Sequence, residues 1–268
     1  MNPEISNSYA NFAKQLKSYS WLLHKVSGDG DNKVAYGLGS GFAVRIDEDT
    51  RTKNQLQPND LIILTCDHVL PADDEIVRVR NFNHKTSFNA RILRRNRSWD
   101  IALLVLQNAA DKFASAEFVE DGNILLSQPL FHVGNPGRFL WSFFIGCAGN
   151  KCTNDAVAPS RRSRKKCFFH KPDLNETASH LKLGDFVNKK FFARPNLIGE
   201  NIKEKMKNLN PSVPVIQCCG MGTAEGCSGG PVFNNEGKIV GMMGFNLVEF
   251  DIVSHVSMLK AYVYDPLC

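Results

Sequence analysis

Short apolar runs, broken by polar and turn residues, follow one another along the chain from residue 35 onward. Each run is strand-length and rich in Val, Ile, Leu and Phe, residue types that favour strands. Strands this closely spaced, with few helical patterns between them, are typical of antiparallel barrels rather than of alternating strand–helix units. We therefore expect an all-β fold. The runs are GSGFAVRI, DLIILTCDHVL, IVRVRNF, FNARILRR, DIALLVL, NILLSQPLFHVGNPG, RFLWSFFIGCAG, VPVIQCC, PVFNNEGKIVGMMGFN and FDIVSHVSMLKAYV.

Two early stretches depart from this pattern. Near the N-terminus, apolar residues recur at spacings of three and four, which predicts one face of a helix; they are Tyr9, Phe12, Leu16, Tyr19, Leu23 and Val26. The end of that stretch, WLLHKV, fits a short strand equally well, and periodicity leaves both interpretations open. Residues 47–59, DEDTRTKNQLQPN, are too polar for a core and predict a long hairpin loop.

The changes of pattern divide the chain into a lead-in and two barrels. We expect an N-terminal lead-in helix within residues 1–30, a first barrel over 31–118 and a second barrel over 119–268. Residues 150–212 are polar, contain helix-compatible stretches and lack strand alternation. We interpret them as a partly helical insertion in the second barrel.

Composition narrows the class of protein. A chain of 268 residues, 43% of them hydrophobic, is long enough to bury a core, and no run approaches the roughly 18 apolar residues of a membrane span. The N-terminus lacks the basic start and apolar core of a secretory signal. The eight cysteines include the adjacent Cys218 and Cys219 and do not form a disulfide framework, so we expect reduced thiols. These features favour an intracellular protein, cytoplasmic or nuclear, without a membrane.

Positive charge is concentrated in one segment. Residues 151–170 contain six basic residues and one acidic residue, an excess equal to the net charge of +5 for the whole chain. The run RRSRKK at 161–166 fits a nuclear localisation signal or a phosphate-binding patch, and also an ordinary solvated loop. One hypothesis is therefore a nuclear, nucleic-acid-associated protein that uses 151–170, although the remainder of the chain shows no broad basic surface.

Three short stretches contain candidate catalytic residues. In GCSGGP, Gly226 to Pro231, Ser228 lies in a Gly-rich turn that exposes a hydroxyl and presents backbone N–H groups, although an ordinary hairpin loop looks similar. In LTCDHV, His68 lies where an apolar strand opens into a polar loop. In WDIALLVL, Asp100 immediately precedes an apolar run. The order His68, Asp100, Ser228 is the chymotrypsin-type order of a catalytic triad.

These motifs together resemble the trypsin/chymotrypsin superfamily, and most closely the protease domain of the Deg/HtrA type. GSGFAV resembles the opening of that domain, DHV its histidine motif, DIALL its aspartate motif, HVGNPG its glycine turn, GCSGGPVFNNEGKIVGM its serine motif and DIVSHVSMLKAYV its closing segment. The resemblance runs from about residue 36 to about residue 262 and is interrupted by 150–212.

The resemblance implies two antiparallel six-stranded barrels with an active site between them. His68 would act as base, Asp100 would orient its imidazole, and Ser228 would attack a peptide carbonyl to form an acyl-enzyme. The backbone N–H groups of Gly226 and Ser228 would form the oxyanion hole. We expect a serine endopeptidase that acts on proteins or peptides without a cofactor or metal. The alternative is a catalytically silent binding protein of the same fold.

Several positions depart from the digestive branch of the superfamily. Cys227 stands where that branch has an aspartate that pairs with a newly freed N-terminus, so activation by N-terminal cleavage is not expected. Val69 stands where that branch has a disulfide cysteine, and we expect the protease domain to lack the PDZ domain of the Deg/HtrA type. The resemblance places substrate contacts at Gly222, Met243, Gly244 and Phe245. Since position 222 carries no carboxylate, we expect a small or apolar side chain at the cleavage site.

Overall fold

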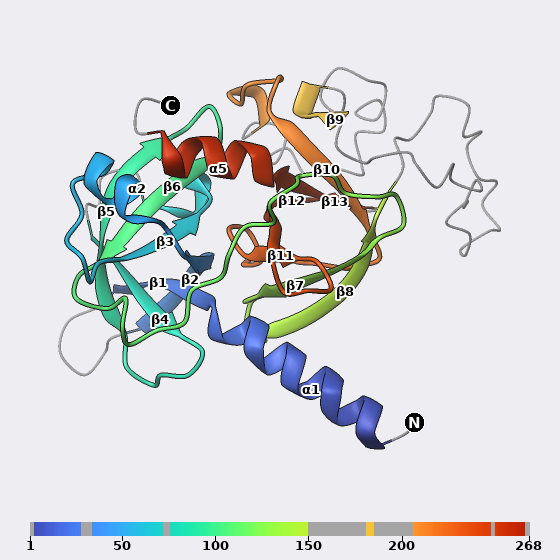
Figure 1. Cartoon of the computed structure of the whole chain (residues 1–268), viewed down its shortest axis with the longest axis horizontal. Coiled ribbons are helices and arrows are strands. Elements are labelled where there is room, and N and C mark those ends of the chain that lie inside the picture. Colours follow the sequence, from blue (N-terminus) through green and yellow to red (C-terminus); the bar gives the residue numbers. More distant parts are fainter. Residues whose placement is uncertain are drawn as a thin grey trace.

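The computed structural model contains two antiparallel β-barrels that lie side by side (Figure 1). This confirms the predicted fold class, a chymotrypsin-like double barrel with an N-terminal helix. The basic segment 151–170 and most of the insertion 150–212 lie outside the residues that the structure describes, and so does most of the helix expected there. The described residues are 3–27, 34–71, 76–149, 181–184, 206–247 and 250–265.

The first barrel is a closed ring of six strands in the order β1-β2-β3-β6-β5-β4. Every residue of β3 and β6 is buried, which explains why LIILT and IALLVL are continuous apolar runs rather than alternating ones. The strands are β1 (Ser20–Ser27), β2 (Val34–Val44), β3 (Leu61–Thr65), β4 (Ile76–Asn81), β5 (Phe88–Asn96) and β6 (Ile101–Leu106).

The structure changes two expectations for the first 60 residues, namely where the lead-in ends and what residues 47–59 form. Helix α1 (Pro3–Ser18) ends before WLLHKV, which forms β1 and pairs with both β2 and β4. The first barrel therefore begins at Ser20 and includes residues that the expected 1–30 lead-in contained. The polar stretch 47–59 is also more than a hairpin loop, because it contains helix α2 (Glu48–Lys53). Asp47 caps α2 by accepting a hydrogen bond from the Thr50 N–H at 2.8 Å.

The second barrel has six strands in the order β13-β12-β11-β7-β8-β10, and the pairing of β10 with β13 closes it. A short strand, β9 (Leu181–Lys182), adds to β10, so part of the insertion extends this sheet although its sequence shows no strand alternation. The six strands are β7 (Pro129–Gly134), β8 (Ser142–Ala148), β10 (Pro214–Cys219), β11 (Pro231–Phe233), β12 (Ile239–Leu247) and β13 (Phe250–His255).

Each terminal helix packs against the barrel that is more distant in the sequence. On α1, Phe12 meets Phe131 of the second barrel edge-to-face, with ring centroids 5.1 Å apart. Helix α5 (Val256–Tyr264) follows β13 and lies against the first barrel (Figure 1), where Arg94 donates hydrogen bonds to its last turn and Trp99 contacts Tyr262. The two helices therefore help to fix the barrels relative to one another.

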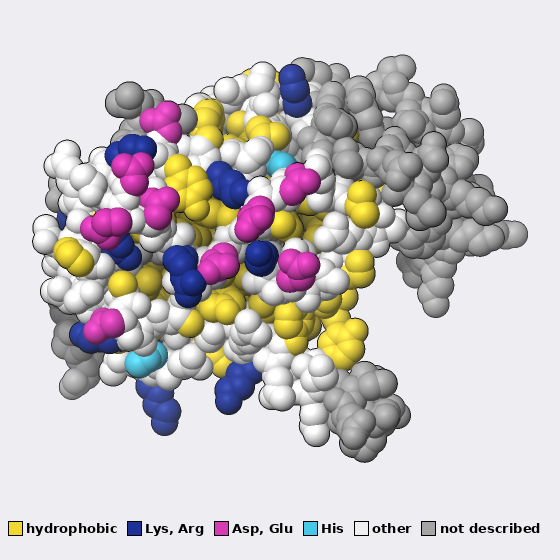
Figure 2. All heavy atoms as spheres, viewed as in Figure 1, with side chains coloured by type: hydrophobic (Ala, Val, Ile, Leu, Met, Phe, Trp, Pro, Cys, Tyr) yellow, Lys and Arg dark blue, Asp and Glu magenta, His cyan; other side chains and the backbone are white. Residues whose placement is uncertain are grey.

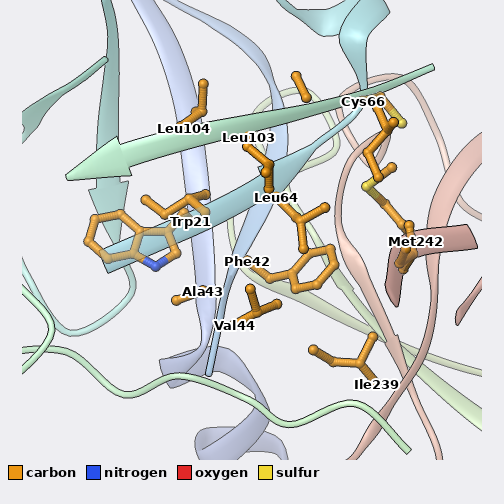
Figure 3. Packing of buried hydrophobic residues seen from close by; sticks show 14 of the residues in the cluster. Trp21, Phe42, Ala43, Val44, Leu64, Cys66, Leu103, Leu104, Ile239 and Met242 are labelled. Carbon is orange, nitrogen blue, oxygen red and sulfur yellow. The ribbon is translucent and has the colours of Figure 1, made fainter. Parts of the chain in front are cut away.

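A single hydrophobic cluster also continues from one barrel into the other. Figure 3 shows Phe42 and Leu64 of the first barrel on one side, Met242 and Ile239 of the second on the other, and Cys66 near their junction. Because interiors are close-packed and deform little, a shared core holds the facing strands at fixed positions. The residues with catalytic potential lie at this junction.

The outer surface shows no strongly charged field on the face drawn in Figure 2. Over the described residues of that face, acidic and basic side chains are interspersed with hydrophobic ones. In the described ranges, none of the helices is long and apolar enough to cross a membrane.

Candidate active site

His68 lies on a short 3-10 turn, η2 (Asp67–Val69), that directly follows β3. Arg95 of β5 braces this turn, since its Nε donates to Asp67 Oδ1 at 2.5 Å and its Nη1 donates to the Pro71 carbonyl at 2.7 Å. The Asp67 and Arg95 side chains are both largely buried, so this ion pair is screened less than a surface pair would be. The Asp67–Arg95 ion pair therefore fixes the turn that carries His68.

Asp100 is brought to His68 by the pairing of β3 with β6, in which Thr65 lies opposite Ala102. The aspartate is buried, with 5% of its surface exposed, and has a left-handed φ of 54°. Its Oδ1 accepts the His68 backbone N–H at 2.9 Å, and its Oδ2 lies 2.7 Å from His68 Nδ1. A carboxylate there requires hydrogen on Nδ1, which leaves Nε2 as the basic nitrogen of the neutral ring.

Ser228 and His68 both contact adjacent residues of β12. The Ser228 hydroxyl donates to the Gly244 carbonyl at 2.9 Å. The Phe245 ring stacks on the His68 imidazole, with centroids 5.4 Å apart and planes 19° from parallel. The hydroxyl must therefore turn away from Gly244 before it can donate to His68, a rearrangement that agrees with the loose catalytic hydrogen bonds common in ligand-free sites.

The turn before β11 contains two backbone N–H groups that its own hydrogen bonds do not use. The Glu225 carbonyl accepts from the Gly137 N–H at 3.1 Å, and the Cys227 carbonyl accepts from the Gly230 N–H at 3.0 Å. In a trans peptide the N–H points opposite to the carbonyl, so the N–H groups of Gly226 and Ser228 face the other way. Neither of them donates to an acceptor within the described residues. Backbone donors left open in this way are available to bind an oxyanion.

Two glycines of this turn have no room for a side chain. A Cβ on Gly226, at φ +97°, would lie 2.3 Å from the Asn135 carbonyl oxygen, and one on Gly229, at φ +83°, would lie 2.2 Å from the Ser40 carbonyl oxygen. Both the left-handed backbone and the contact distances require glycine. The turn therefore packs closely between Asn135, which follows β7, and Ser40 in β2.

The four positions expected to contact substrate are in different environments. Gly222 has a φ of +61°, and the space beside it is open, while Gly244 and Phe245 adjoin Ser228 and His68. Met243 has a 1% exposed side chain, and its backbone N–H and carbonyl bind the carbonyl of Gly230 and the N–H of Gly229. Met243 is thus placed as a support for the serine turn, with its side chain in the core.

Asp251 is a buried carboxyl near these positions that the sequence reasoning missed. It accepts hydrogen bonds from the Thr223 hydroxyl and from Asn246 Nδ2, the latter at 2.8 Å, and burial raises its pKa above the ordinary value. A lone aspartate within the apolar run FDIVSH was the available signal, because a charge seldom occupies a buried strand without a reason. Through Thr223, this carboxyl lies next to the open position at Gly222.

Among the described residues, the group with metal-ligand geometry is Cys66, His68 and Asp100, whose ligand atoms lie within 4.8 Å of one another. Hydrogen bonds account for this proximity, since His68 bonds to Asp100 and the Cys66 thiol donates to the Met243 carbonyl at 3.3 Å. Burial raises the pKa of Cys66, and raises that of Cys227 to about 11. Both cysteines are therefore thiols rather than thiolates near neutral pH.

A double barrel with a histidine–aspartate pair and a glycine-flanked serine at its junction defines a chymotrypsin-like protein. A sequence profile of the trypsin-like peptidase domain matches residues 39–242. This is more than half of the chain, which therefore belongs to the trypsin-like peptidase family. The resemblance to the trypsin/chymotrypsin superfamily is confirmed.

Solved structures share the fold at low sequence identity. The Rv3671c protease in its inactive form is 14% identical, with 98% of this chain and 97% of that chain covered and a TM-score of 0.57. Its active form, from M. tuberculosis, is 13% identical over 98% and 87%, with a TM-score of 0.57. A serine endoprotease from Yersinia pestis is 14% identical over 93% and 63%, with a TM-score of 0.55. No curated protein sequence matches the chain significantly.

Proposed function

We propose that this protein is a serine endopeptidase in which Ser228 attacks the scissile carbonyl. His68 Nε2 takes the hydroxyl proton during the attack and returns it to the leaving amine, and Asp100 stabilises the imidazolium that forms in between. The carbonyl carbon forms a bond to Ser228 Oγ, the bond to the amine breaks, and water then hydrolyses the acyl-enzyme.

One observation supports this proposal above the others. A His68–Asp100 pair with Nε2 available and Ser228 contact adjacent residues of β12, and the N–H groups of Gly226 and Ser228 have no acceptor within the described part of the chain. These are the base, the nucleophile and the oxyanion donors of acyl transfer, contributed by segments far apart in the sequence. A binding protein of this fold has no need to leave both N–H groups of Gly226 and Ser228 without acceptors among the residues that the structure describes.

The test is covalent labelling with a fluorophosphonate probe. Ser228 Oγ would displace fluoride from phosphorus, with His68 accepting the proton. We expect the wild-type protein to be labelled, and Ser228→Ala and His68→Ala to remain unlabelled while folded by circular dichroism. A folded wild-type protein that resists the probe would contradict the proposal and favour the silent binding protein.

We keep a small or apolar side chain as the expected residue at the cleavage site, because position 222 has no carboxylate. A peptide library of varied sequence, digested by wild type and by Ser228→Ala, tests this expectation. Cleavage mainly after Lys or Arg would contradict it and would indicate that Asp251 attracts the basic side chain.

Binding of nucleic acid through 151–170 is the other hypothesis, and it concerns residues outside the described ranges. Loss of salt-dependent DNA binding on deleting 151–170 would support it.

A further inference from the structure

Ser40 of β2 forms hydrogen bonds with the turn that carries Ser228, in addition to its role in the first barrel. Its side chain is fully buried. The Ser40 hydroxyl donates to the Gly226 carbonyl at 2.7 Å, and its oxygen accepts the Asn135 backbone N–H at 3.0 Å and Asn135 Nδ2 at 3.1 Å. The Ser40 backbone N–H donates to the Ser228 carbonyl at 2.9 Å.

These bonds use the whole capacity of the hydroxyl, which has one hydrogen to donate and two lone pairs to accept with. Both lone pairs are taken by Asn135, so the hydrogen is left to point at Gly226. An oxygen with this set of partners has one favourable orientation. Asn135 thereby fixes the direction in which Ser40 donates.

The carbonyls that Ser40 holds are those on either side of Cys227. The Gly226–Cys227 peptide lies between the two peptides whose N–H groups face the oxyanion position. Holding its carbonyl restricts ψ of Gly226, and glycine is the residue with the greatest freedom to rotate there. If that peptide turned, the Gly226 and Ser228 N–H groups would no longer point to a common oxygen.

We propose that Ser40 is a positioning residue, which locks the oxyanion-binding turn of the second barrel to β2 of the first. The contact spans 186 positions of sequence, so the two N–H groups converge only when the barrels are docked. This inference rests on the proposed protease activity and adds a specific requirement to it, namely that the first barrel supplies an orienting hydrogen bond as well as His68 and Asp100.

Ser40→Ala tests this role by removing one buried oxygen. We expect kcat to fall about 10-fold to 100-fold and KM to change less than about twofold, because the donors matter most when charge develops on the oxygen. The affinity for a peptide aldehyde, which forms a tetrahedral oxyanion on Ser228, should weaken by the same factor as kcat. The affinity for the matching product peptide should not change.

Ser20→Ala is the matched control. Ser20 is also a fully buried serine of the first barrel, with its hydroxyl donating to the Leu16 carbonyl at 3.2 Å, and it lies outside the site. We expect Ser20→Ala to retain wild-type kcat at a comparable change in melting temperature. Asn135→Asp supplies a second variant with the hydroxyl intact, since a carboxylate would draw the Ser40 hydrogen away from Gly226, and kcat should again fall.

The outcomes separate this inference from the proposed function. If wild type is labelled by the fluorophosphonate and Ser40→Ala matches Ser20→Ala in kcat and aldehyde affinity, the role of Ser40 is refuted and the protease activity stands. Equal losses in aldehyde and product affinity would also refute it, because they indicate a general disturbance. If wild type is not labelled, the proposed function itself fails.

Discussion

The histidine side of the site, in the first barrel, and the serine side, in the second, are held by different kinds of contact. Side-chain charges hold His68, through Asp100 at its ring and through the Asp67–Arg95 pair at its turn. Backbone groups and glycines hold Ser228, through bonds of Gly229 and Gly230 to Met243. The histidine side therefore depends on charged side chains, and the serine side depends on glycines and on the neutral hydrogen bonds that Ser40 makes to its turn.

This difference has a chemical basis. In the proposed mechanism the imidazole keeps one tautomer and becomes positive during the reaction, which a fixed carboxylate favours. In the same mechanism the serine turn presents two N–H groups to a developing negative charge, which requires an unusual backbone and close approach of substrate. Each side should consequently fail under a different class of substitution.

Asp100→Asn should cause the largest loss of activity, through the histidine side of the site. The amide would face Nδ1 with a hydrogen-bond donor or a weaker acceptor and favour the wrong tautomer, so we expect kcat to fall about 10⁴-fold with the fold retained. Steady-state kinetics on any peptide cleaved by wild type measures this.

Asp60→Asn is the control for Asp100→Asn. Asp60 is also a buried aspartate of the first barrel that accepts a backbone N–H, from Gln57 at 3.0 Å, and it has no contact with the site. The Asp60→Asn substitution should lower the stability of the protein and leave kcat near the wild-type value. If Asp100→Asn keeps activity within tenfold of wild type, Asp100 is not the orienting group.

Gly226→Ala should break the serine side by adding a single methyl group. The new Cβ would lie 2.3 Å from the Asn135 carbonyl oxygen, so the turn must shift and the two N–H groups should diverge. We expect kcat/KM to fall about 10³-fold, the loss typical for an oxyanion donor, while the His68–Asp100 pair stays intact.

Gly237→Ala separates this effect from backbone strain. Gly237 also has a positive φ, +75°, but its nearest contact would be a flexible Leu16 methyl at 3.3 Å. It should cost stability of about 1 kcal/mol or more and leave kcat/KM unchanged. Similar activity losses in the two variants would mean that strain rather than the oxyanion turn is responsible.

The same contrast explains how far the sequence could predict the molecule. The double barrel was predictable because its strands are apolar runs separated by turns, and β3 and β6 are buried on every side. Helix α2 and strand β9 were missed, since elements of six and two residues have too few positions to show a period. Helix α2 is recognised in the structure from the capping hydrogen bond of Asp47, and β9 from its pairing with β10.

At the site, local motifs indicated His68, Asp100 and Ser228 because each lies in a distinctive stretch. The supports around them have no local signature. Ser40 stands in a glycine-rich strand, Arg95 among other basic residues, and Asp251 in an apolar run, and each acts on residues distant in the sequence. Such contacts exist only in three dimensions, so a single sequence does not reveal them.

We predict a smaller effect, on stability rather than on activity, for a second histidine on the serine side. His132 of β7 is fully buried beside Gly230, donates Nδ1–H to the Pro231 carbonyl at 2.9 Å, and has no partner for Nε2 in the described residues. Burial lowers its pKa from 6.5 to about 4.

The unfolded chain therefore binds a proton at this position below pH 6.5, and the folded protein resists it until about pH 4. Stability should fall as pH drops through that window, by about 3 kcal/mol in total. His132→Gln removes the titrating group and loses the Pro231 contact, so we expect it to be less stable than wild type at pH 7.5. Its deficit should shrink by about 2–3 kcal/mol at pH 4.5. Urea unfolding at the two pH values measures the difference, and parallel losses in both proteins would show that acid acts elsewhere than at His132.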